Sequence, residues 1–364
     1  MRIAIVGGGY AGAATAWALS RRGHAAEVLL IEAERKVATH ASGLNAGLVS
    51  PLLDKDEAMA AMSFRGARLL AEHLGMTTCG SVRLVAGEAE AADLVTRAVR
   101  HGIPVRIDKT ADLAREIPLV SGAPTALAVR CEADGKIDPA VLDERYLSEA
   151  REAGATVLTG ARVTSVVASG CRVTRVETTQ GGFDVDLLVN AAGAWAGELA
   201  LLAGLTDLHL ASYRRHLFVT GTIDAVEPAW PWVWDLKHDF YFRIDGKRLT
   251  LCLCDEDAHQ PTPPVVSPVV VADLMAKLPL VFPALGAVTI EESRACLRTF
   301  APDRRFVIGH DPRLSGFFWV AGLGGSGATA GAAIGEMAAD LILGGNGERV
   351  ATNAARHFDP ARLL

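Results

Sequence analysis

The segment RIAIVGGGYAGAATAWALSRRGHAAEVLLIE, residues 2–32, decides the fold of this chain. It opens with an apolar run over 3–6 that predicts a buried strand. A cluster of glycines follows, and then an alanine-rich stretch over about 11–22 that predicts a helix. A second apolar run ends at Glu32. The order strand, glycine turn, helix, strand is typical of a parallel βαβ unit that binds a dinucleotide.

The glycines have the spacing that such a unit requires. Gly7, Gly9 and Gly12 form the pattern G-x-G-x-x-G. The first allows a tight turn, the second lets a pyrophosphate approach the backbone, and the third lets the helix pack closely on the strand. Glu32 follows Gly12 by twenty residues, where a carboxylate can accept both hydroxyls of an unphosphorylated adenosine ribose. We therefore expect NAD or FAD, not a dinucleotide with a 2′-phosphate.

Composition narrows the class of protein further. The chain has 364 residues, 50% hydrophobic and 21% charged, with a net charge of −6. A sizeable core is expected, and nucleic acid is an unlikely partner because there is no basic excess. The six cysteines lack the close spacing of a disulfide framework, and Cys252 and Cys254 have no nearby histidine pair that would complete a metal site. We expect a cytoplasmic protein without a bound metal.

No membrane span is expected. The strongest candidate, residues 317–345, has glycines crowded into its first half and Glu336 and Asp340 in its second. A span needs about 20 uninterrupted apolar residues. Arg2 leads directly into the first strand, so no signal peptide is expected either.

The pattern along the chain predicts an α/β fold with two interleaved domains. LLVNAAG at 187–193 is apolar on both faces, as in a buried parallel strand, whereas 208–254 alternates as in an antiparallel sheet. One domain would bind the dinucleotide on a mostly parallel sheet, and the other would bind substrate on a mixed or antiparallel sheet. The expected dinucleotide-binding domain is 1–80, 140–207 and 295–364, and the expected substrate domain is 81–139 and 208–294.

Four further segments resemble a known family. They are THASGLNAGLVS (39–50), LLVNAAGAWAGELALLAG (187–204), CLRTFAPDRRFVIG (296–309) and GFFWVAGLGGSGATAGAAIGEMAADL (316–341). Together they are similar to the FAD-dependent D-amino-acid oxidase and dehydrogenase family, of the glycine oxidase, sarcosine oxidase and D-arginine dehydrogenase type. The resemblance covers essentially the whole chain. It implies a GR2-type FAD-binding fold with FAD as the cofactor.

The resemblance also implies which residues bind FAD. Small residues after the second strand could lie against a flat ring and phosphates. Glycines before the C-terminal helix would aim its positive end at the flavin, where negative charge appears on reduction. The expected cofactor-binding residues are Gly7, Gly9, Gly12, Glu32, Ser42, Gly43, Asn45, Ala46, Gly47, Val163, Ala192, Gly193, Trp195, Cys296, Gly322, Gly324, Gly325, Gly327, Ala328 and Thr329.

On the substrate side, Arg298, Arg215 and Tyr241 match family residues that hold the substrate carboxylate. Arginine suits this role because its planar fork makes two parallel charge-assisted hydrogen bonds. Arg214 would point the opposite way from Arg215 on a strand. The choice between these two arginines stays open, and we favour Arg215.

Departures from the family pattern bear on specificity. Members of the D-arginine dehydrogenase type hold a basic side chain through a glutamate, and the matching position here is Val82. Leu48 and Leu53 replace two further polar residues, while Ser50 keeps a hydroxyl. We expect a small, neutral substrate, since a buried cation without a partner is costly. If the register slips by one residue, Arg83 would instead face an acidic substrate.

The predicted function is oxidation of the C–N bond of a small, neutral or N-substituted amino acid. Hydride transfer to flavin N5 would give an imine that hydrolyses to an oxo acid. One alternative is oxidation of a modified wobble uridine in tRNA, because 41–58 is similar to part of such an enzyme. Another is an FAD-binding interaction protein without turnover. The electron acceptor is unknown, and the chain is expected to be a monomer or a homodimer.

Cys296 raises the question of covalent attachment. It matches a sarcosine oxidase cysteine that bonds the flavin through sulfur, and on a strand it would share a side with Arg298. Arg294 or Arg298 could lower the pKa of its thiol. A buried cysteine is commonly just a small apolar residue, however. Covalent and non-covalent FAD both stay open.

Overall fold

The computed structural model describes residues 1–22, 26–345 and 354–364. The opening segment folds as β1 (Arg2–Val6), α1 (Tyr10–Ser20) and β2 (Glu27–Ile31). β1 and β2 pair in parallel, with Val6 opposite Ile31. Gly9 is the N-cap residue of α1, so the helix begins at the glycine turn. The predicted βαβ unit is confirmed.

A mostly parallel sheet extends this unit, in the strand order β20-β21-β13-β1-β2-β9. β13 is parallel to both β1 and β21, and β20 runs antiparallel to β21. Every residue of β13 is buried, as its apolar sequence predicts. The added strands are β9 (Thr156–Leu158), β13 (Leu187–Asn190), β20 (Val307–His310) and β21 (Phe317–Ala321).

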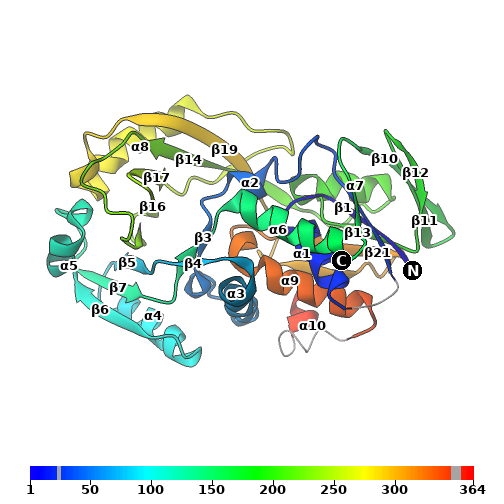
Figure 1. The fold of residues 1–364 in the computed structure, drawn as a ribbon, viewed down its shortest axis with the longest axis horizontal. Helices are drawn as coiled ribbons and strands as arrows, with labels where there is room; N and C mark the ends of the chain where they lie inside the picture. The colour runs from blue at the N-terminus through cyan, green and yellow to red at the C-terminus, as the bar shows by residue number, and fades with distance from the viewer. Residues whose placement is uncertain (23–25, 346–353) are drawn as a thin grey trace.

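Helices cover one face of this sheet and a small antiparallel sheet covers the other. Ile3 and Ile5 of β1 belong to the core shared with the helices, whereas Ala4 and Val6 pack on the opposite side. Figure 1 shows α1, α6 and α9 grouped beside β1 and β13. The helical layer comprises α1, α3 (Glu57–Leu69), α6 (Pro139–Glu152) and α9 (Gly327–Ile342). The opposite layer comprises α7 (Ala196–Leu202), β10 (Val163–Ser169), β11 (Arg172–Thr178) and β12 (Gly181–Asp184).

A second, longer sheet follows the order β18-β14-β17-β16-β15-β5-β7-β6, and β19 also pairs with β14. Its pairs are antiparallel apart from β15 with β5, so the sheet is mixed, as predicted. α5 and α8 pack on its core. The elements are β5 (Ser81–Val85), β6 (Val105–Lys109), α5 (Thr110–Glu116), β7 (Leu127–Cys131), β14 (Ala211–Thr220), β15 (Trp232–Asp235), β16 (Phe240–Asp245), β17 (Arg248–Cys252), β18 (Asp257–Ala258), α8 (Pro268–Val281) and β19 (Ile290–Phe300).

The two halves lie side by side in Figure 1, with β3 and β4 between them. β19 pairs with β14 from Ile290 to Phe300, so the expected domain boundary at residue 295 falls inside this strand. The division into two domains stays a prediction. The remaining elements are α2 (Ala41–Leu44), β3 (Leu48–Val49), β4 (Thr77–Thr78), α4 (Glu88–Arg100), β8 (Gly135–Lys136) and α10 (Ala354–Phe358).

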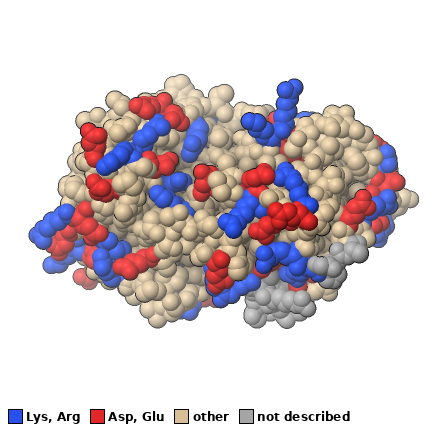
Figure 2. Space-filling model, in the orientation of Figure 1, with Lys and Arg blue, Asp and Glu red and all other residues tan. Residues whose placement is uncertain are grey.

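The surface and the helices bear on possible partners. Among the described residues, no helix is long and apolar enough to cross a membrane. Figure 2 shows basic and acidic groups interspersed on the face that it draws, so the charges there do not gather into a basic stripe that would follow a phosphate backbone.

Candidate active site

A cavity of about 790 Å³ lies where the two sheets meet. Val6, Ile31 and Ala321, at the carboxyl ends of parallel strands, line it. Ligands of open α/β sheets bind at this edge. Residues of β16 and β19 from the second sheet line the other side. All the predicted site residues reach this cavity except Gly12, Gly43 and Arg215.

The glycine turn is shaped by close backbone contacts. Gly7 has φ +113°, and a Cβ there would come within 2.3 Å of the carbonyl oxygen of Ala191. A Cβ on Gly12 would come within 1.9 Å of the Gly7 carbonyl oxygen. Gly12 therefore serves the site by letting α1 approach β1, as predicted, and does not itself line the cavity. Gly9 does line it, next to Ser42.

Glu32 lies at the end of β2 and lines the cavity. Its Oε2 accepts a hydrogen bond from the amide of Gly8 at 2.7 Å, and its Oε1 accepts one from the amide of Glu34 at 2.8 Å. These bonds hold the carboxylate in place. Each oxygen has a second lone pair, so a ribose hydroxyl can still donate to it.

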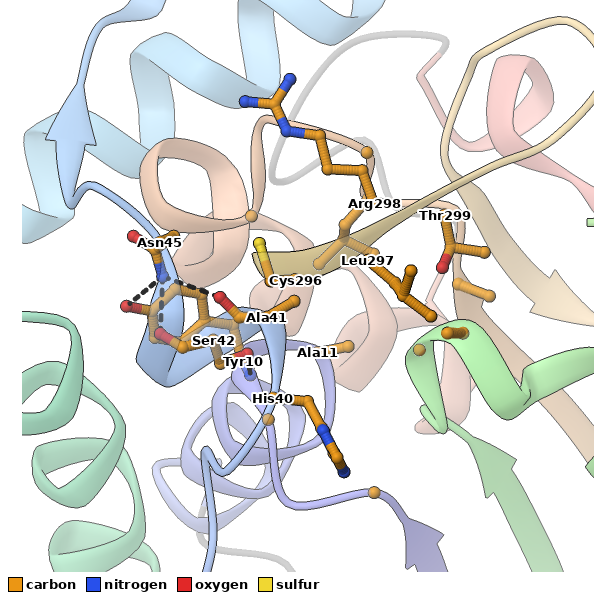
Figure 3. A pocket seen from close by; sticks show the side chains of 18 of the residues that line it. Tyr10, Ala11, His40, Ala41, Ser42, Asn45, Cys296, Leu297, Arg298 and Thr299 are labelled. Atoms are coloured by element: carbon orange, nitrogen blue, oxygen red, sulfur yellow. Dashed lines mark hydrogen bonds between the residues drawn. The ribbon is translucent and has the colours of Figure 1, made fainter. Parts of the chain in front are cut away.

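The loop after β2 closes over the start of α1. Ser42 Oγ accepts a hydrogen bond from the amide of Tyr10 at 2.9 Å. Asn45 Nδ2 donates to the hydroxyl of Tyr10 at 3.3 Å and to the carbonyl of Ala41 at 3.1 Å, as Figure 3 shows. A Cβ on Gly43 would lie 2.0 Å from a carbonyl oxygen, so this glycine packs against the loop and does not reach the cavity.

The glycine-rich turn before α9 forms another wall. Gly324 has φ +55°, and a Cβ there would overlap the ring of Phe300 at 2.3 Å. The turn leads into the N-terminus of α9, whose Ala328 and Thr329 line the cavity. Thr329 Oγ1 accepts a hydrogen bond from the amide of Ser50 at 3.2 Å. The positive end of a sixteen-residue helix therefore faces the cavity.

Arg298 is half-buried on β19 and lines the cavity. Its guanidinium forms no hydrogen bond or ion pair with any residue that the structure describes. Figure 3 shows that Arg298 and Cys296 leave the strand on the same side. An arginine with free donors inside a cavity is suited to bind an anion.

Tyr241, on β16, is buried, lines the cavity and lies close enough to Arg298 to interact with its charge. Burial raises the pKa of Tyr241 well above its usual range, and the positive charges of Arg298 and Arg215 oppose this rise. The phenol is therefore protonated and can donate a hydrogen bond. Its ring lies 5.0 Å from that of Trp234, which also lines the cavity.

The two adjacent arginines of β14 lie in different environments. Arg215 is buried, with Nη2 3.8 Å from Glu256 Oε1. Arg214 instead pairs with the exposed Asp257 at 3.2 Å. Arg215 lies close enough to Tyr241 for its charge to oppose the rise in the pKa of that phenol. Glu256 lines the cavity, whereas Arg215 does not.

The pKa of Cys296 differs from our expectation. Burial raises the pKa of this thiol to about 11, and the nearby Arg298 offsets burial only in part. Arg298 and Arg294 do lower the pKa of Cys296, as expected, but burial of the sulfur outweighs them. Cys296 does line the cavity.

The strand SVRLV does not line the cavity. Val82 packs into the core of the second sheet. Arg83 is fully buried, with Nη2 2.6 Å from Asp134 Oδ2. The alternative in which Arg83 faces an acidic substrate is wrong, because this charge is already neutralised by Asp134. Leu48, Ser50 and Leu53 do line the cavity.

Several lining residues had no clear signal in the sequence. His40 lies 3.3 Å from Glu34 and its ring centroid is 4.5 Å from that of Trp195. Glu256 accepts a hydrogen bond from Arg304 at 2.7 Å. Trp195 and Arg304 are distant in the sequence from His40 and Glu256, respectively. Only the tertiary structure brings the members of these two pairs together at the cavity. No group of metal-binding side chains occurs among the described residues.

A glycine-rich βαβ unit beside a cavity at the carboxyl ends of its strands is the arrangement of a dinucleotide-binding protein. A family model for FAD dependent oxidoreductases matches residues 2–341. The chain is 26% identical over 363 residues to 4-methylaminobutanoate oxidase (formaldehyde-forming) of Paenarthrobacter nicotinovorans, covering 95% of this chain and 44% of that protein. It is 24% identical over 375 residues to the mitochondrial pyruvate dehydrogenase phosphatase regulatory subunit of Mus musculus, covering 94% of this chain and 41% of that protein.

Among solved structures, L-proline dehydrogenase from P. horikoshii has a TM-score of 0.88 at 23% identity, covering 99% of this chain and 97% of that one. This likeness concerns the fold. The chain spans less than half the length of the two curated relatives. It belongs to the FAD dependent oxidoreductase family. The expected cofactor, FAD, is therefore confirmed.

The described residues fit this cofactor. The turn at Gly7 and Gly9 leaves no side chain between the cavity and the backbone, which suits a pyrophosphate. Glu32 and the N-terminus of α9 line the same cavity, where a carboxylate could accept ribose hydroxyls and a helix N-terminus could stabilise negative charge on a flavin. A lining of a glycine turn, a carboxylate and a helix N-terminus is compatible with FAD.

Proposed function

We propose that the chain oxidises the C–N bond of a small, neutral amino acid or N-substituted amino acid. The observation that carries this proposal is the guanidinium of Arg298, which lines the cavity without a partner among the described residues. A carboxylate is the anion that such a fork binds most directly. When bound, FAD supplies a hydride acceptor.

The protein's own residues orient the substrate. Arg298 binds the carboxylate through two parallel hydrogen bonds, and the protonated Tyr241 donates a third. Arg215, held against Glu256 at 3.8 Å, adds positive charge behind Tyr241. Fixing the carboxylate at this wall fixes the position of the α C–H bond, which lowers the entropic part of the barrier.

The side-chain end of the cavity favours a neutral substrate. Leu48, Leu53 and Trp234 line it, and Glu256 is already paired with Arg304 at 2.7 Å. A cationic side chain would therefore be buried without a free acidic partner. The similarity to 4-methylaminobutanoate oxidase supports an N-methylated amine as the reacting group. Hydride loss from the α-carbon would give an imine that water hydrolyses to an oxo acid and an amine, whereas hydride loss from an N-methyl group would give formaldehyde and the amino acid.

An anaerobic screen of the purified yellow protein tests this proposal. N-methylglycine, glycine, N-methylalanine and proline should bleach the flavin absorbance, whereas arginine and glutamate should not. Bleaching by tRNA that carries a modified wobble uridine, and not by amino acids, would replace the proposal with the nucleic-acid alternative. No bleaching by either class would favour an FAD-binding protein without turnover, in line with the similarity to a regulatory subunit.

We also propose a cytoplasmic location, with the domain division given above. All six cysteines are free thiols, which suits a reducing compartment.

A further inference from the structure

Two cysteines lie against each other at the end of β17, beside the wall of the cavity. Cys252 is the last residue of this strand and is fully buried, whereas Cys254 lies in the loop that follows and is half-buried. Neither cysteine lines the cavity. Both pack in one cluster with side chains that do line it, namely those of Ala46, Leu48, Trp234 and Tyr241.

The backbone turns Cys254 back towards Cys252. Cys254 has φ +55°, in the left-handed region that a residue with a side chain seldom adopts. Its amide donates a hydrogen bond to Cys252 Sγ at 3.4 Å, and its thiol donates a second hydrogen bond to the same sulfur. In a regular strand, residues two apart are separated by roughly 6.6 Å, so this turn brings the two sulfurs together. Uncommon backbone conformations of this kind cluster at functional sites.

Arg215 supplies positive charge to this pair. It lies on the neighbouring strand β14, and its Nη1 is 4.0 Å from Cys252 Sγ. Burial raises the pKa of the Cys252 thiol, but the hydrogen bond from Cys254 and the charge of Arg215 outweigh burial and lower the pKa to about 6. The hydrogen bond to Cys252, together with burial, raises the pKa of the Cys254 thiol well above its usual range. At neutral pH the pair therefore shares one proton, and a thiolate is the reactive form of cysteine.

We infer that Cys252 and Cys254 form a peroxide-reactive dithiol, which reduces hydrogen peroxide and is converted to a disulfide. Cys254 is the more exposed of the two residues, so peroxide should reach its sulfur first. The proton of Cys254 passes along the existing hydrogen bond to Cys252, and the Cys254 sulfur attacks one peroxide oxygen. The O–O bond breaks, hydroxide leaves and Cys254 becomes a sulfenic acid.

The second step closes the disulfide. The Cys252 sulfur attacks the sulfenic sulfur of Cys254, and the S–S bond forms as hydroxide leaves. This hydroxide takes up the proton of Cys252 and becomes water. Over both steps, hydrogen peroxide gains two electrons and gives one hydroxide and one water, while the two cysteines lose the same two electrons.

The disulfide changes the charge beside the cavity wall. A neutral disulfide replaces the thiolate next to Arg215, which keeps the contact of its Nη2 with Glu256 Oε1 at 3.8 Å. The charge of Arg215 acts on Tyr241, and both Tyr241 and Glu256 line the cavity. Oxidation of the dithiol therefore alters the electrostatics of this wall.

Mass mapping of the thiols in the FAD-bound full chain tests this inference. It uses no amine substrate, so its outcome is independent of the proposed function. The reduced protein is treated with hydrogen peroxide, denatured, alkylated with N-ethylmaleimide and digested. Trypsin cleaves after Arg248 and Lys277, so both cysteines lie in the single peptide 249–277, whereas Cys296 lies in another. We expect peptide 249–277 to lose two hydrogen atoms and to resist alkylation, and dithiothreitol should reverse both changes.

Two serine variants separate the roles of the sulfurs. Cys252→Ser removes the thiolate that accepts the proton, so Cys254 should react at least about tenfold more slowly and end as a sulfenic acid. Cys254→Ser removes the more exposed sulfur and should leave Cys252 open to alkylation. Cys171→Ser, at an exposed cysteine, is the matched control and should form the disulfide at an unchanged rate. An unchanged flavin spectrum verifies that each variant is folded.

Three results would overturn the inference. One is full alkylation of Cys252 and Cys254 at a peroxide concentration that already oxidises the exposed Cys171. Another is a disulfide that joins either cysteine to Cys296 instead. The third is a Cys252→Ser variant in which Cys254 is oxidised as fast as in the unmodified protein.

Discussion

The guanidinium of Arg298 lies directly against Gly325, where a Cβ would come within 3.1 Å of Nη1 and 3.2 Å of Cζ. Gly325 belongs to the turn that leads into α9, so the absence of its side chain leaves room for the arginine beside the helix N-terminus. The proposed carboxylate anchor and the wall expected to face the flavin are therefore in contact. This contact links substrate orientation to cofactor position.

Gly325→Ala should crowd the arginine without removing it. The added methyl group must displace the guanidinium by a few tenths of an ångström, because the approach at 3.1 Å is closer than ordinary contact. We expect the half-saturating concentration of a carboxylated substrate to rise roughly tenfold, equal to about 1.4 kcal/mol. Flavin content should be unchanged. Gly197→Ala, in α7, is the control, since nothing lies within 4 Å of its added Cβ and the residue does not line the cavity. An equal effect in both variants would contradict this role for Gly325.

Gly12→Ala should abolish FAD binding. A Cβ at this position would lie 1.9 Å from the Gly7 carbonyl oxygen, so α1 and the glycine turn would have to separate. Gly197→Ala, in α7, has nothing within 4 Å of the added atom and should stabilise the fold by about 0.5–1 kcal/mol. Flavin absorbance and thermal unfolding of the two variants measure these effects. Yellow, stable protein from Gly12→Ala would show that the predicted packing role is wrong.

Asp143 should make stability depend on pH. It is fully buried, and neither carboxylate oxygen has a hydrogen-bond partner among the described residues. Burial, reinforced by Glu32 and Glu144, raises its pKa to about 8. In the unfolded chain the same group titrates near about 4. Between these values only the unfolded state loses the proton, so the free energy of unfolding falls as pH rises from about 4 to about 8 and then levels.

Asp143→Asn removes this titration. The difference in the free energy of unfolding between Asp143→Asn and the unmodified protein should therefore change with pH. It should shift by a few kcal/mol in favour of the variant as pH rises from acidic values to above the folded pKa. Urea unfolding of both proteins at pH values of about 5, 7 and 9 measures this difference. Parallel pH profiles for the two proteins would show that Asp143 is not buried in its neutral form.

FAD should be bound without a bond to Cys296. At neutral pH its thiol is protonated, since burial raises the pKa to about 11, and the thiolate is the reactive form. Acid precipitation should leave a colourless pellet and free FAD in the supernatant. A yellow pellet that becomes colourless in Cys296→Ser would establish the covalent bond instead.

The parts of the fold that follow from local sequence could be predicted. The βαβ unit at 2–32 was predictable because the glycine spacing and apolar runs act within one short segment. The buried strand over Leu187–Asn190 was predictable for the same reason. The glycines of the turn before α9 were also placed at the cavity by their motif.

Contacts between distant segments could not be predicted in this way. Arg83 was expected in the pocket only if the register slipped by one residue, but Asp134, 51 residues further along the chain, neutralises it. Glu256 and Arg304 meet at the cavity only because two separate loops converge there. The burial that raises the pKa of Cys296 likewise depends on the packing of β14 and β19.

The central claim is that Arg298 binds the carboxylate of the oxidised amine. The measurement that tests it most directly is the rate of anaerobic flavin reduction as a function of substrate concentration, for the unmodified protein and Arg298→Ala. Each protein is given an N-methyl amino acid and the matching N-methyl amine that lacks a carboxylate. Arg298→Ala should keep its FAD and should need about 100-fold more of the amino acid for half-saturation, the loss expected for a charge-assisted pair worth nearly 3 kcal/mol. The two proteins should respond alike to the amine. Unchanged saturation by the amino acid in Arg298→Ala would contradict the claim.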